Sequence, residues 1–179
     1  IEKLKNTILF RNMSRSGIFL LLSLLVLKGC TVNYSFSGAS IDPKMKTYSV
    51  QYFANRAPLV VPTLSQQLTE ALREKIRSQT KLLLVTGVGD ADFSGEITRY
   101  ETRAVAITGN DRPAQNRLTM DVRVRYTNSV NPKEGFESTF SRYKDYDANQ
   151  SLAVVEQDLI KDILELLAED IFNKAFVNW

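Results

Sequence analysis

The sequence predicts an α+β domain, a two-layer sandwich in which two helices pack on one face of a mainly antiparallel sheet of about four strands. Residues 117–127, RLTMDVRVRYT, alternate strictly between apolar and polar side chains, which is typical of a sheet with one packed and one wet face. Residues 62–79 and 151–173 repeat apolar side chains at helical spacing, so each helix has one apolar stripe to bury. Packing both stripes on the apolar face of the sheet is the economical arrangement.

The first half of the domain begins with a strand. Residues 46–53, KTYSVQYF, alternate and are rich in β-branched and aromatic side chains. A helix follows, with Thr63 as its expected N-cap and Gln66 three residues later, which is the pattern of a capping box. Residues 81–86, KLLLVT, then predict a short buried strand. The glycines and acids of residues 87–92, GVGDAD, are typical of a turn and lack the spacing of a phosphate loop.

Three long strands complete the expected sheet. In the first, residues 92–108, the apolar positions change phase, which predicts a β-bulge near Arg99. Residues 109–116, GNDRPAQN, predict a hairpin loop before the clearest strand, 117–127. Residues 136–146, FESTFSRYKDY, predict the returning strand.

The last predicted element is a helix from about Ser151 to Asn173, roughly 35 Å long. Asp147 is a candidate cap for it. A coiled coil is the alternative, but about three heptads are weak support for one. The apolar stripe consists of Leu152, Val155, Leu159, Ile163, Leu166, Leu167 and Ile171.

A short hydrophobic leader precedes the domain. Residues 18–27 are apolar except for Ser23, and this run is too short to span a bilayer, which takes about 20 apolar residues. Basic residues before the run and a small residue after it are typical of a secretory signal peptide, which we assign to residues 1–29. Met13 is the candidate true start, because the sequence from there on already has the full pattern. A buried structural helix is the alternative.

The end of the leader, LKGC, resembles a bacterial lipobox in Leu27, Gly29 and Cys30, and departs from it at Lys28. In that family of signals the cysteine becomes the first mature residue, is thioether-linked to diacylglycerol, and is N-acylated, for instance with palmitate. The resemblance therefore implies that Cys30 carries a multi-chain lipid anchor, which binds membranes far more strongly than one acyl chain. Thr31 follows instead of an acidic residue, which by analogy with lipoprotein sorting implies the periplasmic side of the cell outer membrane. An ordinary signal peptide with an incidental cysteine is the alternative.

The chain thus divides into the signal peptide 1–29, a lipidated N-terminus and tether 30–45, and the α+β domain 46–179. The signal peptide holds five of the 23 basic residues and one of the 20 acidic residues, which leaves 18 basic and 19 acidic residues, a net charge of −1, for the rest. A nucleic-acid-binding domain needs a basic patch, which this balance does not favour. We therefore expect no nucleic-acid partner.

The residue types also argue against catalysis. The chain has no histidine and one cysteine, so a Ser-His-Asp triad, a Cys/His zinc site and an intrachain disulfide are all excluded. Paired acids, as glycosidases use, do occur, but at a turn, a strand end and a helix end, where charges are ordinary. We expect no enzyme activity, metal or cofactor. The pairs are Asp90 with Asp92, Asp145 with Asp147, and Glu169 with Asp170.

Three sequence blocks join the lipobox and the α+β pattern: ADFSGEITRY at residues 91–100, FSRYKDYDANQSL at 140–152, and DIFNKAFVNW at 170–179. Together they resemble the LPS-assembly lipoprotein LptE family, particularly its Bacteroidetes branch. The resemblance implies an outer-membrane lipoprotein that plugs the β-barrel LptD, supports its assembly and helps lipopolysaccharide reach the outer leaflet. The partners it implies are LptD, lipopolysaccharide and the membrane itself. The alternative is a free-standing periplasmic amphiphile carrier or chaperone.

Arginines on the polar sheet face are the candidates for binding lipopolysaccharide phosphate, because a guanidinium group binds phosphate bidentately. The competing interpretation is a solvated strand face on which Asp121 and Glu101 balance the charge. The candidates are Arg99 and Arg103 on one strand, Arg112 at the hairpin tip, and Arg117, Arg123 and Arg125 on the next strand.

Overall fold

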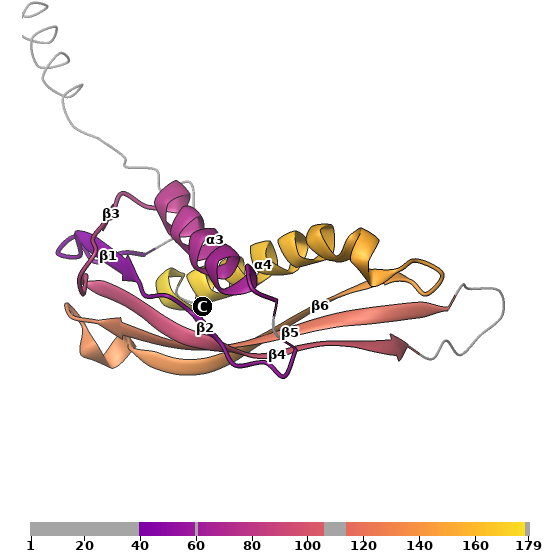
Figure 1. Ribbon diagram of the computed structural model, residues 1–179. Helices are drawn as coiled ribbons and strands as arrows, with labels where there is room; N and C mark the ends of the chain where they lie inside the picture. The colour runs from indigo at the N-terminus through magenta and orange to yellow at the C-terminus, as the bar shows by residue number, and fades with distance from the viewer. Residues whose placement is uncertain (1–39, 60, 106–113, 178–179) are drawn as a thin grey trace, which may run out of the picture. The chain divides into compact units, whose positions relative to one another are not determined.

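The predicted architecture is present in a computed structural model that describes residues 40–59, 61–105 and 114–177 (Figure 1). The chain divides into two units, residues 1–35 and 36–179, and every described residue belongs to the second. The predicted signal peptide, Cys30 and Arg112 lie outside the described residues. Within the second unit, both helices lie on one side of a mostly antiparallel sheet (Figure 1).

The sheet of the described residues has six strands rather than about four, in the order β3-β1-β4-β5-β6, with β2 paired to β4. Its three long strands β4, β5 and β6 are antiparallel, whereas β1 runs parallel to β3 and β4, and β2 runs parallel to β4. The strands are β1 (Thr47–Val50), β2 (Ala54–Asn55), β3 (Leu83–Leu84), β4 (Ala91–Val105), β5 (Gln115–Asn128) and β6 (Phe136–Asp147).

The prediction of a buried strand at residues 81–86 is wrong about its burial. The segment expected to be a short buried strand does pair with β1, but Leu83 and Leu84 are 69% and 50% exposed, and only Leu82 beside them is buried. The reason is its position, because β3 is two residues long and forms the edge of the sheet.

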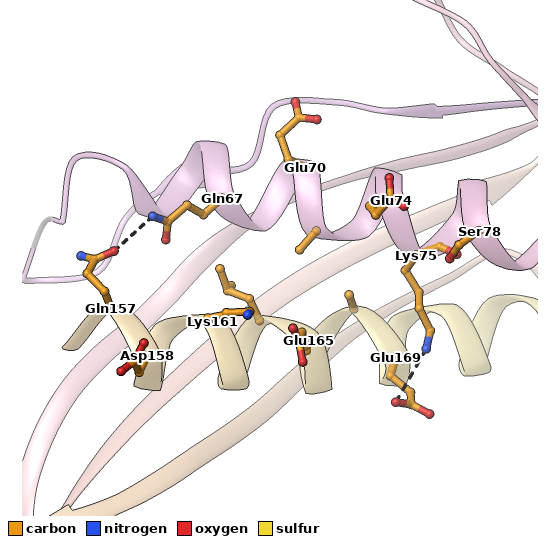
Figure 2. A pocket seen from close by; sticks show the side chains of 13 residues that line it. Gln67, Glu70, Glu74, Lys75, Ser78, Gln157, Asp158, Lys161, Glu165 and Glu169 are labelled. Atoms are coloured by element: carbon orange, nitrogen blue, oxygen red, sulfur yellow. Dashed lines mark hydrogen bonds and ion pairs between the residues drawn. The ribbon is translucent and has the colours of Figure 1, made fainter. Parts of the chain in front are cut away.

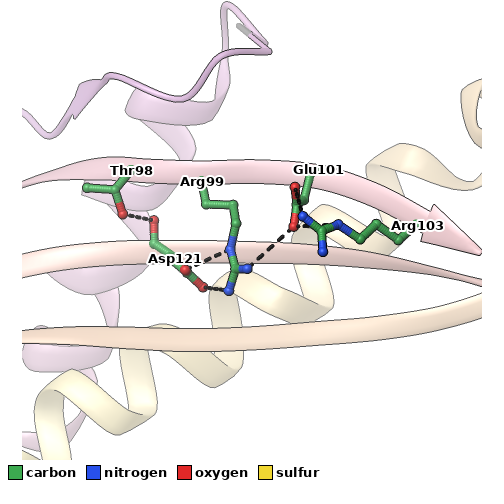
Figure 3. Close-up of polar contacts among 5 residues, drawn as sticks. All are labelled: Thr98, Arg99, Glu101, Arg103 and Asp121. Atoms are coloured by element: carbon green, nitrogen blue, oxygen red, sulfur yellow. Dashed lines mark hydrogen bonds and ion pairs between the residues drawn. The ribbon is translucent and has the colours of Figure 1, made fainter. Parts of the chain in front are cut away.

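The predicted β-bulge in β4 is confirmed. Ile97 pairs with Val122 of β5, but the next pair is Arg99 with Asp121, so Thr98 is the extra residue. The Thr98 hydroxyl donates to the backbone oxygen of Asp121 at 3.3 Å (Figure 3). Because the extra residue shifts the alternation, the odd-numbered residues after it join the polar face.

Both predicted helices form, as α3 (Leu64–Gln79) and α4 (Leu152–Phe176), together with a short 3₁₀ turn, η1 (Pro132–Glu134). Helix α3 lies against β1, β2 and β3, whereas α4 lies against β5 and β6, and the two helices contact each other. Among the described helices, none combines the length and the apolar character needed to cross a bilayer.

The two predicted helix caps are not made by side chains. Thr63 has φ −86° and ψ −12°, a helical conformation in which it forms no side-chain cap, whereas capping needs an extended backbone. Asp147 instead accepts the backbone N–H of Asn149 at 2.8 Å, inside the turn before α4. The N-cap position of α4 is Ser151.

The core lies between the helices and the sheet, where apolar stripes meet the inward face of β5. Full burial of each such side chain stabilises the fold by about 1.5–3 kcal/mol. On these three elements, the apolar residues with no more than 1% exposure are Leu64, Leu68, Leu72 and Ile76 of α3, Ile160, Ile163, Leu167 and Ile171 of α4, and Leu118, Met120, Val122, Val124 and Tyr126 of β5.

Strand β6 is attached to α4 partly by charge. Arg142 and Lys144 form ion pairs with Asp170 and Asp162 of α4, the second at 3.0 Å. These basic residues therefore occupy the helix side of β6, where β5 carries apolar residues.

Candidate functional site

The candidate site is the open face, which we define as the outward side chains of β4, β5 and β6 on the side of the sheet away from the helices. Alternation along each strand puts polar residues there, as the sequence predicts. The central members are Glu96, Arg99, Glu101 and Arg103 of β4, Arg117, Thr119, Asp121, Arg123 and Arg125 of β5, and Glu137, Thr139, Ser141, Tyr143 and Asp145 of β6.

Arg99 lies beside the bulge and is anchored to Asp121 (Figure 3). Its Nη2 donates to Asp121 Oδ1 at 3.0 Å, and its Nε lies 2.7 Å from Asp121 Oδ2. The hydrogen bond to Asp121 raises the pKa of the Arg99 guanidinium above its ordinary value. Glu101 lies between Arg99 and Arg103, at 3.4 Å and 3.1 Å from their nitrogens. Both acids that the sequence predicted to balance this face are therefore engaged.

Arg117 is held from two sides. Its Nε and Nη2 donate to the two oxygens of Asp145 at 2.7 Å and 2.9 Å, a bidentate pair. Its guanidinium carbon lies 3.7 Å from the centre of the Tyr143 ring, which is a cation–π contact. The hydrogen bond from Arg117 lowers the pKa of the Asp145 carboxyl.

Arg123 and Arg125 are paired more loosely. Arg123 lies 3.3 Å from Glu96 across the β4–β5 pair, and Arg125 lies 3.0 Å from Glu137 across the β5–β6 pair. More than half of each arginine side chain is exposed, so each pair adds little to stability.

A shallow hollow of about 490 Å³ marks the part of the open face beyond the bulge. Its lining includes Arg99, Arg103 and Arg117, together with Glu101 and the hydroxyl groups of Thr119 and Tyr143. Three guanidinium groups and one carboxylate thus line the hollow, and two of the arginines, Arg99 and Arg117, are also paired with Asp121 and Asp145 beside it. Guanidinium groups together with hydroxyls suit a phosphorylated sugar.

Within this hollow, Arg103 and Arg117 place two positive charges next to each other. The two residues are direct partners in the β4–β5 register. Like charges directly opposite each other on a sheet are destabilising. The Arg103 side chain is 74% exposed, and among the described residues its ion pair is with Glu101 of its own strand. An anion placed between the two arginines would relieve their repulsion.

The structure therefore separates the predicted arginines. Arg99, Arg103 and Arg117 share the hollow, whereas Arg123 and Arg125 lie on the same face outside it. Arg112 lies outside the described residues. Sequence reasoning missed three balancing acids, Glu96, Glu137 and Asp145, because the register that places them beside an arginine was not assigned.

A second groove, of about 790 Å³, lies between α3 and α4 (Figure 2). Gln67 donates to Gln157 at 3.4 Å at one end, and Lys75 lies 3.7 Å from Glu169 near the other. Its rims are charged and its floor includes Ala71, Leu164 and Ala168. Sequence reasoning missed this groove because its two helices are far apart in the chain.

The paired acids beside the turn have a structural role. Asp90 Oδ2 accepts the backbone N–H groups of Lys46 and Thr47 at 2.8 Å and 3.0 Å, which lowers the pKa of the carboxyl. Asp92 accepts hydrogen bonds from Ser49 and Gln51. In the part of the chain that the structure describes, no three acidic or sulfur ligands are grouped to hold a metal ion.

Comparisons with known proteins agree with this architecture. Rare lipoprotein B from Shewanella oneidensis is 14% identical over 72% of this chain and 92% of its own, with a TM-score of 0.50, which shows a shared fold. A minor lipoprotein from Acinetobacter baumannii is 16% identical over 73% and 91%, with a TM-score of 0.43. Curated proteins give no match. A family model described as LptE, lipopolysaccharide-assembly, matches residues 45–175. Because this match spans nearly all of the folded domain, the chain belongs to the LptE lipopolysaccharide-assembly family.

Proposed function

We propose that this chain is an outer-membrane lipoprotein that plugs the LptD β-barrel, supports its assembly and helps lipopolysaccharide reach the outer leaflet. Family membership over residues 45–175 carries the proposal. In this role the protein works by binding, without catalysis. Lipidated Cys30 holds it on the periplasmic side of the outer membrane.

The surface of the domain suits a plug. Large barrels have polar interiors, so a body inside one must present polar groups and keep its own shape. The open face presents arginines and carboxylates that are already paired with each other. Such a face enters a polar lumen without leaving an uncompensated charge.

Co-purification tests the partnership. The intact, affinity-tagged lipoprotein is extracted in mild detergent, and its bound proteins and lipids are identified by mass spectrometry. A stoichiometric β-barrel is the expected finding. Recovery of the free lipoprotein alone would contradict the proposal. Cys30→Ala, with acyl labelling as the readout, tests the anchor separately, because loss of the label is expected only if Cys30 is lipidated.

The hollow on the open face is the proposed contact for lipopolysaccharide phosphate. Arg99, Arg103 and Arg117 supply the donors there, and Arg123 and Arg125 add positive charge along the same face. A phosphate group would take the place of Glu101 as the partner of Arg103, which is the most exposed of the three.

Charge reversal tests this contact with a control on the same face. Arg103→Glu is expected to weaken binding of purified lipopolysaccharide by about tenfold to a hundredfold, the loss expected for a charge-assisted hydrogen bond. Arg125→Glu makes the same change outside the hollow and is expected to weaken binding less. Equal effects of the two variants, with unchanged thermal unfolding, would count against the hollow.

The alternative, a free-standing amphiphile carrier, needs an apolar cavity between helices and sheet. There the structure places side chains such as Leu68, Leu72 and Val122, which are fully buried. The hollow of the open face and the groove between α3 and α4 both lie on outer surfaces. These observations favour the plug over the carrier.

A further inference from the structure

Three exposed apolar side chains project from one short segment at one end of the domain. Leu83, Leu84 and Val88 are 69%, 50% and 79% exposed, although neighbouring Leu82 is buried. We name residues 83–88 the apolar tip. It comprises β3 and the turn that leads toward β4, at the end of the sheet where β3 is labelled in Figure 1.

The apolar tip is held firmly against β1. The N–H groups of Leu83 and Val85 donate to the backbone oxygens of Lys46 and Tyr48, both at 2.9 Å. Directly after the tip, Gly89 packs so closely that a Cβ there would lie 2.7 Å from the carbonyl carbon of Tyr48. The exposed side chains are therefore carried on a fixed support.

The chain enters the domain at the same end. The N–H of Ser40 donates to the backbone oxygen of Phe176, at the end of α4, at 2.8 Å. Six residues later, Lys46 accepts the hydrogen bond from Leu83. Ser40 is ten residues after Cys30, and a segment of that length reaches at most about 35 Å. A lipid anchor at Cys30 would therefore keep this end of the domain near the bilayer.

Charge near the apolar tip has the sign that a membrane surface attracts. The exposed side chains of Lys44, Lys46 and Lys81 form no ion pair among the described residues. Two acids lie among these lysines and accept backbone N–H groups, Asp42 that of Lys44 and Asp90 that of Lys46, so the three lysines outnumber them. Lysines around exposed apolar side chains are typical of a segment that binds the interface of an anionic bilayer.

We propose that the apolar tip contacts the phospholipid surface to which the protein is anchored. Leu83, Leu84 and Val88 enter the headgroup and acyl boundary, while the lysines stay at the anionic headgroups. The contact orients the domain, since attachment at a single residue would leave it free to turn. The proposal rests on the proposed lipid anchor at Cys30.

An environment-sensitive probe measures this contact directly. Once Cys30 is lipidated, Val88→Cys provides a unique thiol for a fluorophore such as NBD. Val154→Cys is the matched control, because Val154 is also a valine with 79% exposure but lies in the first turn of α4. The lipidated chains are reconstituted in vesicles of phosphatidylcholine and phosphatidylglycerol, with nitroxide-labelled lipid as the quencher.

The probe at position 88 is expected to shift its emission to shorter wavelength and to be quenched by the nitroxide lipid, whereas the probe at position 154 stays in water. The double substitution Leu83→Ser and Leu84→Ser should reduce the quenching at position 88 without lowering the thermal stability. Equal signals at the two positions would overturn the proposal. The proposal would also be overturned if the probe at position 88 were shielded from water only in the detergent-extracted complex with a barrel. That result would indicate a contact with protein instead of lipid.

A second format separates this proposal from the anchor. Residues 30–179 carrying Cys30→Ala and an N-terminal hexahistidine tag are held on vesicles by nickel-chelating lipid, and the two probe positions are compared again. If Cys30 proves not to be acylated but position 88 still shows quenching, the anchor fails and the apolar tip stands. If acylation is found and position 88 stays in water in both formats, the apolar tip fails and the anchor stands.

Discussion

Arg117 gains its fixed position from two neighbours on β6, Asp145 and Tyr143. The carboxylate sets the plane of the guanidinium group and the ring supports one face of it. A group held in this way loses little conformational entropy when it binds an anion. In the proposed contact with phosphate, Arg117 is therefore the fixed donor and Arg103, with a side chain that is 74% exposed, is the freer one.

A single glycine in β4 illustrates how closely the strands approach. A Cβ at Gly95 would overlap the backbone oxygen of Arg123 and the ring of Phe53. We expect Gly95→Ala to lower the free energy of unfolding by about 1–3 kcal/mol through overpacking. Gly87→Ala is the control, because a Cβ there has no described atom within 4 Å. Urea denaturation of both variants compares them, and equal stability would refute the close packing at Gly95.

Two buried tyrosines predict an alkaline limit to stability. Burial raises the pKa of Tyr126 to about 12 and also raises the pKa of Tyr100, which donates to Glu156 at 2.7 Å. Because the pKa is higher in the folded state, the stabilisation is complete below pH about 10 and is lost as the pH rises toward about 12.

For Tyr126 alone this loss amounts to about 2–3 kcal/mol at the alkaline extreme. Urea denaturation between about pH 8 and about pH 11 should show the decline. Tyr126→Phe removes the titrating group and should make the decline shallower. A decline of the same slope in that variant would assign the effect to other groups.

At the scale of elements, the bulge decides which side chains of β4 belong to the open face. Ile97 and Tyr100 both point inward, which a regular strand does not allow for residues three apart. Thr98 takes up the extra step. The bulge thus puts Arg99 and Arg103 on the same face as Arg117.

Deleting Thr98 should therefore be tolerated. The deletion removes the extra residue and leaves every later residue of β4 on its present face, so we expect one cooperative unfolding transition and a loss of about 1 kcal/mol or less. Deleting Arg123 from β5 is the contrasting change, because it moves half of a strictly alternating strand to the wrong face. Circular dichroism during thermal unfolding distinguishes them. Loss of cooperative unfolding on deletion of Thr98 would contradict this account.

The sequence predicted those features that follow from whether each residue in turn is apolar or polar. Strict alternation located β5, and a change of phase located the bulge, because inward and outward residues differ in polarity. Strands β2 and β3 are two residues long, and their pairing depends on distant segments. The prediction of a side-chain cap at Thr63 was wrong because the local sequence does not fix the backbone angles of that residue. The arginines of the hollow were predicted, but their partners on β6 depended on an unassigned register.

Across the whole domain, the two faces of the sheet differ in how much they contribute to stability. The helix side holds the fully buried apolar residues, and the open face holds ion pairs that remain partly exposed. Since exposed ion pairs contribute about 0–1 kcal/mol each, stability comes mainly from the helix side. The open face is then able to change partners without unfolding the domain.

Paired substitutions test this division. Replacing Arg123 and Arg125 together by serine should lower the free energy of unfolding by less than about 2 kcal/mol. Leu68→Ala on the helix side should cost about 2–5 kcal/mol, because it leaves a cavity in the core. Chemical denaturation measures both. A larger loss for the arginine pair would mean that the open face is part of the structural core.

The ion pairs between β6 and α4 have a further consequence for self-association. Strand β6 ends the sheet in the described structure, and the backbone groups along such an edge are a template for a strand of another molecule. Arg142 and Lys144 place charge on the side of β6 where a stacked, aggregated sheet would need apolar contact. Asp170 and Asp162 pair with these charges only while α4 is packed on the sheet. The basic residues that attach the helix thus also disfavour edge-to-edge aggregation at β6.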